Sequence, residues 1–148
     1  MSSKFPIVHI DMRVFAHATE DQDKVLTSAR NLIPPEHVEA ISFKKTNMTG
    51  HHGNPIILLE ARIEDKNAIE GFFRNLARGL NSLDKEQLGT EIEKSLEKGN
   101  LYLRLDKQSA YQDRLKLEPA DPIRLKLHFK RPNVEEVKDI CRKYGLIK

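Results

Sequence analysis

Two adjacent histidines lie between two glycines at residues 49–55 (TGHHGNP), in a chain that has only six histidines. Imidazole binds metals and transfers protons, so a metal site, a catalytic site or a ligand-contacting loop comes into question. A metal site needs three or four suitably spaced ligands, and no nearby cysteine or HxxxH pattern accompanies His51 and His52. No acid pair, nucleophile motif or phosphate-binding glycine loop accompanies them either. We therefore expect no enzyme, no metal and no cofactor, and keep a metal-assisted hydrolase built on the two histidines as a weak alternative.

Two other interpretations of the same segment remain open from the residues alone. It can be only a turn between two strands, with Gly50 and Gly53 supplying backbone angles that other residues avoid. It can also present the histidines, Asn54 and free backbone amides to a phosphate or a groove, supported by lysines at positions 44 and 45.

The segment DPIRLKLHFKRP (residues 121–132) carries the clearest functional pattern. Apolar residues alternate there with Arg124, Lys126, His128 and Lys130. This period of two predicts a strand with one buried and one cationic face. Together with Arg104, and with Arg114 and Lys116 of a predicted short strand, these side chains would form a cationic sheet surface. Such a surface neutralises phosphates and releases counterions; the alternative is a solvated sheet face that happens to use lysine and arginine.

The charge distribution agrees with a local cationic surface, although the whole chain has a formal net charge of only +3. Residues 98–131 hold nine basic and four acidic side chains, whereas residues 64–97 hold five basic and eight acidic ones. This asymmetry within a small protein favours a positive patch.

Hydrophobic periodicity and helix N-cap residues predict the strands and helices that position these side chains. Strands are expected at residues 5–16, 38–48, 56–64, 100–106, 114–119 and 123–130. Helices are expected after Thr19 as N-cap, after Asp65, after Ser82 or Asp84, and near 132–145, where Cys141 would be a small core residue. The order is β-α-β-β-α-α-β-β-β-α. Clean alternation implies an antiparallel sheet backed by helices, hence a two-layer α+β fold.

Length and composition limit the protein class. With 148 residues and 39% hydrophobic content, the chain is expected to form a single domain, 1–148, with the C-terminal helix appended. Its apolar runs are too short to cross a bilayer, and its N-terminal residues do not resemble a secretory signal. One cysteine fits a reducing compartment. We therefore expect a cytoplasmic protein that does not bind membranes.

Three segments together resemble a known archaeal family. They are FAHATED at residues 15–21, TGHHGNPIILLEARI at 49–63 and KGNLYLRLDKQ at 98–108. The family is that of predicted RNA-binding exosome subunits with a double-stranded-RNA-binding-like, ribosomal protein L5-like fold. The resemblance implies RNA binding in RNA processing or degradation, or in ribosome biogenesis, with exosome or ribosome-assembly proteins as partners. It covers residues 8–129 and supplies no catalytic residues.

The leading hypothesis is a non-enzymatic RNA-binding protein whose ligand is structured or double-stranded RNA, because aromatic residues are too few for a single-strand stacking platform. The alternative is an adaptor subunit that docks a protein through Ile56 and Leu58 or through the last helix. The residues expected to contact RNA are Lys44, Lys45, Thr49, His51, His52, Asn54, Arg104, Lys107, Gln108, Arg124 and Lys126.

Overall fold

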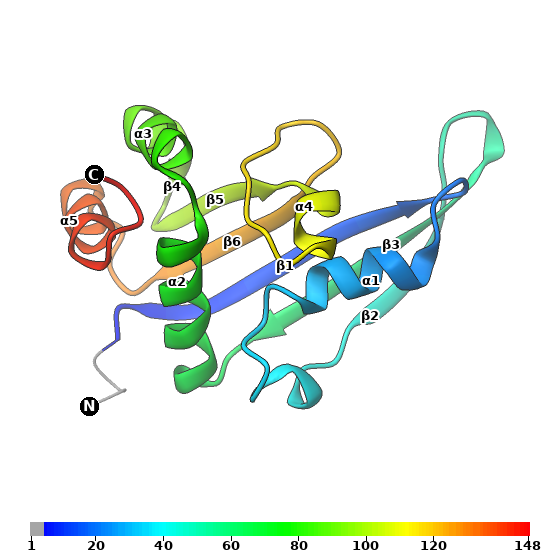
Figure 1. Cartoon of the computed structure of the whole chain (residues 1–148), viewed down its shortest axis with the longest axis horizontal. Helices are drawn as coiled ribbons and strands as arrows, with labels where there is room; N and C mark the ends of the chain where they lie inside the picture. The colour runs from blue at the N-terminus through cyan, green and yellow to red at the C-terminus, as the bar shows by residue number, and fades with distance from the viewer. Residues whose placement is uncertain (1–4) are drawn as a thin grey trace.

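The computed structural model of this protein describes residues 5–148, except for the side chain of His51. Six strands form one antiparallel sheet in the order β2-β3-β1-β6-β5-β4 (Figure 1). The strands are β1 (Ile7–His17), β2 (Lys44–Thr49), β3 (Pro55–Ile63), β4 (Leu96–Glu97), β5 (Asn100–Leu105) and β6 (Ile123–Phe129). The longest strand, β1, pairs with β3 on one side and with β6 on the other. Strands distant in sequence therefore meet at the centre of the sheet.

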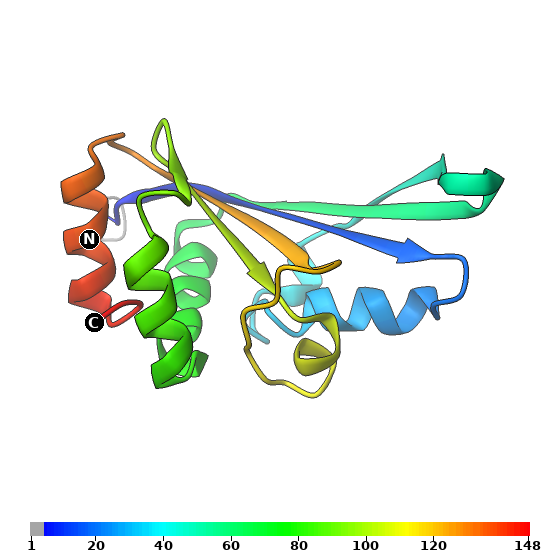
Figure 2. The same cartoon turned by 90° about the horizontal axis from the view of Figure 1, so that it is seen from above.

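All five α-helices lie on the same side of this sheet. They are α1 (Gln22–Arg30), α2 (Lys66–Gly79), α3 (Ser82–Glu91), α4 (Lys107–Tyr111) and α5 (Val134–Tyr144). Figure 2 views the sheet along its edge and shows the helices gathered beneath it, with the opposite face uncovered. The predicted α+β fold, an antiparallel sheet backed by helices, is confirmed.

The core lies between the sheet and the helices, as the alternation of apolar residues requires. On β6 the side chains of Ile123, Leu125, Leu127 and Phe129 are at most 1% exposed. Phe73 of α2 packs edge-on against Phe129, with ring centroids 6.3 Å apart. Cys141 is fully buried, as predicted, and burial raises the pKa of its thiol to about 12. It is therefore a neutral core residue.

Several predicted boundaries were wrong. Asp21, not Thr19, caps α1: its carboxylate accepts hydrogen bonds from the backbone N–H groups of Asp23 and Lys24. The second strand begins at Lys44, after the short 3-10 helix η2 (Val38–Ala40). Residues 114–119 form no strand and meet the sheet only in an isolated bridge between Leu117 and Leu105. A short helix, α4, follows β5 instead, because Asp106 accepts a hydrogen bond from the Ser109 backbone N–H.

The hairpin of β2 and β3 extends beyond the helices, and its tip is a turn, η3 (His51–Gly53) (Figures 1 and 2). The Gly50 N–H donates to the Asn54 carbonyl at 2.7 Å and closes the turn. Gly53 and His52 adopt left-handed angles, with φ of 75° and 59°. Gly50 does not, contrary to expectation; a Cβ there would instead collide with the side chain of Ile56.

Among the helices of residues 5–148, none combines the length and the apolar character that a membrane span requires.

Candidate functional site

The uncovered face of the sheet carries a broad hollow lined by cations. Its volume is about 650 Å³. Two carboxylates, those of Asp11 and Glu60, are also in its lining. The cations lining it are Arg13, Lys44, Arg62, Arg104, Arg124 and Lys126. They come from five neighbouring strands, and each occupies a position whose sequence neighbours point to the opposite, helix-covered face of the sheet.

Three arginines form a row across the middle of this face. Arg13 of β1 lies directly opposite Arg124 of β6, and Arg124 lies directly opposite Arg104 of β5. Like charges at directly opposed positions of a sheet are destabilising. Neither Arg104 nor Arg124 has a carboxylate within 4.0 Å among the residues that the structure describes. The row is therefore a concentration of positive charge that an anion can relieve.

The remaining charges of the hollow are partly paired around Asp11. Arg62 donates two hydrogen bonds to the Asp11 carboxylate, at 2.7 and 3.1 Å. This hydrogen bonding raises the pKa of Arg62. Lys126 Nζ lies 3.9 Å from the same carboxylate, and Arg13 Nε lies 3.2 Å from Glu60 Oε2. Six cations against two carboxylates leave the hollow strongly positive.

Beside the hollow, the same face carries a pair of stacked histidines. The rings of His9 and His128 lie 4.9 Å apart at an angle of 20°. His128 Nδ1 is 2.6 Å from the Asn100 side-chain oxygen. Burial lowers the pKa of His9, and the nearby positive charge of Arg62 lowers it further. His9 is therefore neutral at neutral pH and adds no charge to this face.

Of the predicted contact residues, Lys44, Arg104, Arg124 and Lys126 are brought together in the hollow. Lys45 is not, because adjacent strand residues point to opposite faces: Lys45 pairs with the core residue Leu59, whereas Lys44 pairs with Glu60. Thr49 is on the face of Lys45. His52 and Asn54 are at the hairpin tip, roughly 20 Å from Lys44 at about 3.3 Å per residue. The His51 side chain lies outside the described residues.

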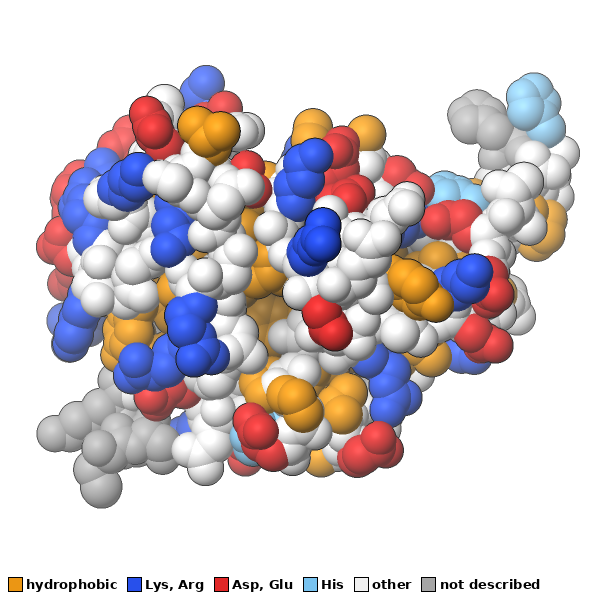
Figure 3. Space-filling view, in the orientation of Figure 1, with side chains coloured by type: hydrophobic (Ala, Val, Ile, Leu, Met, Phe, Trp, Pro, Cys, Tyr) orange, Lys and Arg blue, Asp and Glu red, His pale blue; other side chains and the backbone are white. Residues whose placement is uncertain are grey.

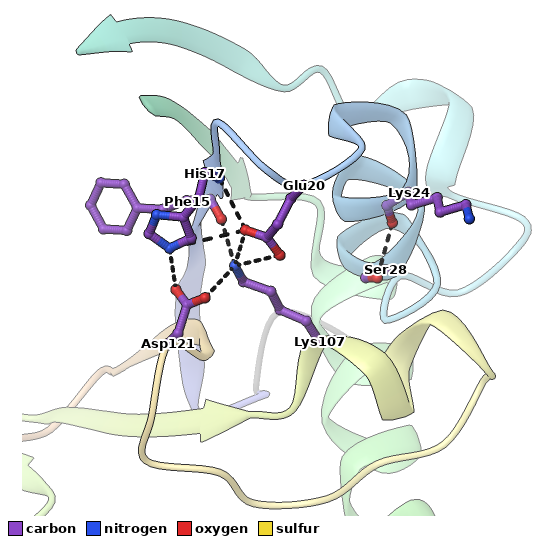
Figure 4. A network of polar contacts seen from close by, with 7 residues as sticks. All are labelled: Phe15, His17, Glu20, Lys24, Ser28, Lys107 and Asp121. Carbon is purple, nitrogen blue, oxygen red and sulfur yellow. Dashed lines mark hydrogen bonds and ion pairs between the residues drawn. The ribbon is translucent and has the colours of Figure 1, made fainter. Parts of the chain in front are cut away.

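Lys107 has a different position from the one expected. Its ammonium group donates to the Phe15 carbonyl at 2.6 Å, to Glu20 Oε1 at 3.0 Å and to Asp121 Oδ2 at 2.9 Å (Figure 4). His17 Nε2 is 2.9 Å from the other Asp121 oxygen. The side chain of Lys107 is only 11% exposed. It holds α4 and the segment around Asp121 against the end of β1 and is not part of the cationic hollow.

This network occupies the one cluster of described residues whose atoms could hold a metal, formed by His17, Glu20 and Asp121. The Lys107 ammonium lies between the two carboxylates and offsets part of their negative charge. The next residue, Gln108, is exposed and lines a separate hollow with Tyr111 and Asp121. Two of the segments that carry the family resemblance, 15–21 and 98–108, thus meet here in a structural contact.

Arg13 and Arg62 also line the hollow, although they are not among the residues predicted to contact RNA. Both alternate with buried residues, Arg13 with Met12 and Val14, Arg62 with Ala61 and Ile63. Their periodicity therefore marks them as outward-facing. What the sequence does not show is the strand order that sets β1 between β3 and β6. Conversely, Arg114 does not join the hollow, because its segment is not a strand; it lines a recess with Leu32 and Phe72 beside α2.

The helical side differs from the open face. Figure 3 shows that side, where basic and acidic side chains are interspersed and apolar side chains surround a recess. On the open face, Leu58 is directly opposite Phe15 of β1 and Thr46 of β2 and is only 6% exposed. Leu58 is therefore not the exposed docking residue that the adaptor alternative requires.

Comparisons with known proteins show the family to which the chain belongs. Residues 9–129 match the model of a family described as RNA binding. An RNA-binding protein of Pyrococcus abyssi is 35% identical over 133 residues, covering 88% of this chain and 86% of its own. A DUF54 protein of Methanothermobacter thermautotrophicus has a TM-score of 0.78 at 28% identity, covering 95% of this chain and 99% of its own. For a DUF54 protein of Archaeoglobus fulgidus the TM-score is 0.77 at 28% identity, over 93% and 99%. The chain belongs to the RNA-binding family whose model it matches.

Proposed function

We propose that this protein binds RNA through the open face of its sheet. The observation that carries the proposal is the row of Arg13, Arg124 and Arg104 on adjacent strands. A row of opposed like charges costs stability, and phosphates in the hollow would remove that cost. Membership of the RNA-binding family and the name of the Pyrococcus relative support RNA as the polyanion.

The shape of the surface favours structured RNA. The hollow is wide and open, and its cations are spread over five strands, so it suits the phosphate backbone of a folded or double-stranded segment. Proteins read such RNA mostly by shape and by contacts with phosphate and ribose. Within the hollow's lining, Tyr102 is the one aromatic residue. A continuous platform for stacking successive single-stranded bases is therefore absent from this lining.

The hairpin tip offers a second point of contact. His52, Asn54 and the tip backbone project beyond the helical layer, roughly 20 Å from Lys44 along the strands. A duplex lying in the hollow can extend toward the tip, which then contacts backbone or groove. RNA processing, degradation or ribosome assembly, with exosome or ribosome-assembly proteins as partners, is the biological setting that the family resemblance suggests.

The experiment compares two charge reversals with the same change in net charge. Arg124→Glu alters the open face, whereas Arg114→Glu alters an exposed arginine on the helical side. Affinity for a labelled RNA hairpin is measured by fluorescence anisotropy at fixed salt. Arg124→Glu should weaken binding about tenfold or more, because it removes one phosphate contact and adds a repulsive charge. Arg114→Glu should have a much smaller effect. Equal effects of the two variants would contradict the proposal.

A further inference from the structure

One stretch of the sheet edge has backbone groups without partners. On the outer edge of β5, the Tyr102 N–H donates to the Ser95 carbonyl at 2.9 Å, and the Glu118 N–H donates to the Arg104 carbonyl at 3.0 Å. The Phe129 N–H donates to the Gly99 carbonyl at 2.8 Å. In the β5–β6 register, odd-numbered residues of β5 therefore direct their backbone groups toward β6 and even-numbered residues direct theirs away from it. Residues 102 and 104 therefore direct their backbone groups away from β6, toward this outer edge.

Between these two hydrogen bonds lie the Tyr102 carbonyl and the Arg104 N–H. Neither group has a hydrogen-bond partner among the residues that the structure describes. An acceptor and a donor thus stand side by side, two residues apart, on an open strand edge. Such unpaired groups are ready to bond a ligand that presents the complementary pair.

The same edge borders a second hollow of about 370 Å³. The polar residues of its lining include Gln87, Glu91, Lys94, Arg104 and Glu118. This lining holds two cations, one of them the Arg104 shared with the open face, and two carboxylates, in contrast with the excess of cations in the hollow on the open face. A charge-balanced recess with polar groups suits a neutral polar ligand better than a phosphate.

Tyr102 connects the two hollows. Its side chain is on the open face, directly opposite Lys126, and Tyr102 is 39% exposed. It lines both the cationic hollow and the edge hollow, as Arg104 does. A chain of nucleotides passing from one hollow to the other would cross the tyrosine ring, against which a base can stack.

We propose that the edge hollow binds one unpaired nucleobase of the RNA that occupies the open face. This inference rests on the proposed function. The Watson–Crick edge of a base presents a donor and an acceptor side by side, which pair with the Tyr102 carbonyl and the Arg104 N–H. In adenine these are the N6 amino group and N1. The ligand is thus a structured RNA with an unpaired nucleotide beside its helical part, in preference to an uninterrupted duplex.

The experiment uses two RNA hairpins that differ by one bulged adenosine, with affinity measured by anisotropy on the full chain. We expect wild-type protein to bind the bulged hairpin on the order of tenfold more tightly, the usual effect of one stacked base. Tyr102→Leu should reduce this preference to near unity, and Tyr102→Phe should retain it. Tyr111→Leu is the matched control, because Tyr111 is similarly exposed but lines a different hollow on α4.

A second pair of variants tests the backbone donor. Because the Arg104 N–H faces away from the ladder, Arg104→Pro removes it without removing a sheet hydrogen bond. Arg104→Pro should lose the preference for the bulge, whereas Arg104→Ala, which lacks the same side chain, should keep it. Circular dichroism verifies that both variants are folded.

Three results would overturn the inference: equal wild-type affinity for the two hairpins, a preference that survives Tyr102→Leu, or adenosine monophosphate binding as tightly as the bulged RNA. The last result would assign the hollow to a free nucleotide. None of these removes the proposed function, which fails separately if Arg124→Glu leaves affinity for the uninterrupted hairpin unchanged.

Discussion

The two faces of β6, a strand of seven residues, differ in what surrounds their side chains: one is covered by the helices and the other lines the cationic hollow. On the covered face, Leu125 and Leu127 are buried beneath the helices and stabilise the fold. On the open face, Arg124 and Lys126 face the hollow, and Arg124 lies between two other arginines. One face gains stability from packing, and the other tolerates repulsion. The difference shows that the cations of the open face add no packing to the core, which is what our proposal of an anionic ligand for this face requires.

Loss of a core aromatic on the covered side should have the largest effect. Phe73 is fully buried and packs against Phe5, Phe129 and Tyr144. Phe73→Ala should lower the free energy of unfolding by about 3–5 kcal/mol, because it leaves a cavity. Denaturant unfolding measures this, with the 77%-exposed Leu83 changed to alanine as control. A loss no larger than that of the control would contradict this description of the core.

Removal of the Lys107 ammonium should have the next largest effect. Lys107→Met should lower the free energy of unfolding by about 1–3 kcal/mol, because Glu20, Asp121 and the Phe15 carbonyl lose a shared donor. RNA affinity of the folded protein should not change. Lys45→Met, at an exposed lysine on the same chain, is the control. If Lys107→Met left stability unchanged but weakened RNA binding, Lys107 would be an RNA-contacting residue, as the sequence predicted, and not a structural one.

Neutralising the central arginine should have the opposite effect on stability. Arg124→Gln removes like-charge repulsion from Arg13 and Arg104 and should raise the free energy of unfolding by roughly 0.2–1 kcal/mol. The same variant should bind RNA less tightly. Denaturation and anisotropy on one preparation measure both properties. A fall in stability together with affinity would contradict the inferred destabilising repulsion among the three arginines of the open face.

The smallest effect should appear only at acidic pH. Burial raises the pKa of Asp121, but hydrogen bonds from His17 and Lys107 outweigh it and hold that pKa below 3.8. The carboxylate therefore stabilises the fold above pH 3.8, and this contribution is lost as pH falls through the lowered pKa. Asp121→Asn should flatten the dependence of stability on pH below that value, whereas Asp113→Asn should not. Parallel acid curves for wild type and Asp121→Asn would contradict this.

The sequence predicts much of the fold because local alternation determines which side chains leave the core. The outward positions of Lys44, Arg104, Arg124 and Lys126 follow from that period. Lys45 was misplaced because two adjacent lysines of a strand cannot share a face. The 114–119 segment was misassigned because Leu115 and Leu117 alternate with basic residues, although only Leu117 reaches the sheet.

Long-range arrangement was not predictable from local pattern. That β1 lies between β3 and β6, which brings Arg13 and Arg62 into the hollow, depends on strand order. The contacts of Lys107 with Glu20 and Asp121 join residues 87 and 14 positions apart. Sequence periodicity cannot predict contacts between residues so far apart. A lysine that follows a strand is therefore expected to be a surface residue, and only the fold shows that Lys107 is enclosed by Glu20 and Asp121.

The dependence of RNA affinity on salt tests the central claim most directly. The slope of log Kd against log salt concentration is compared between wild type and the double variant Arg104→Gln/Arg124→Gln. Each lost phosphate contact should reduce the slope by roughly 0.7–0.9, so the double variant should lose about 1.5. An equal reduction from Lys45→Gln/Arg114→Gln, or an unchanged slope for the open-face variant, would contradict an RNA-binding role for the arginine row.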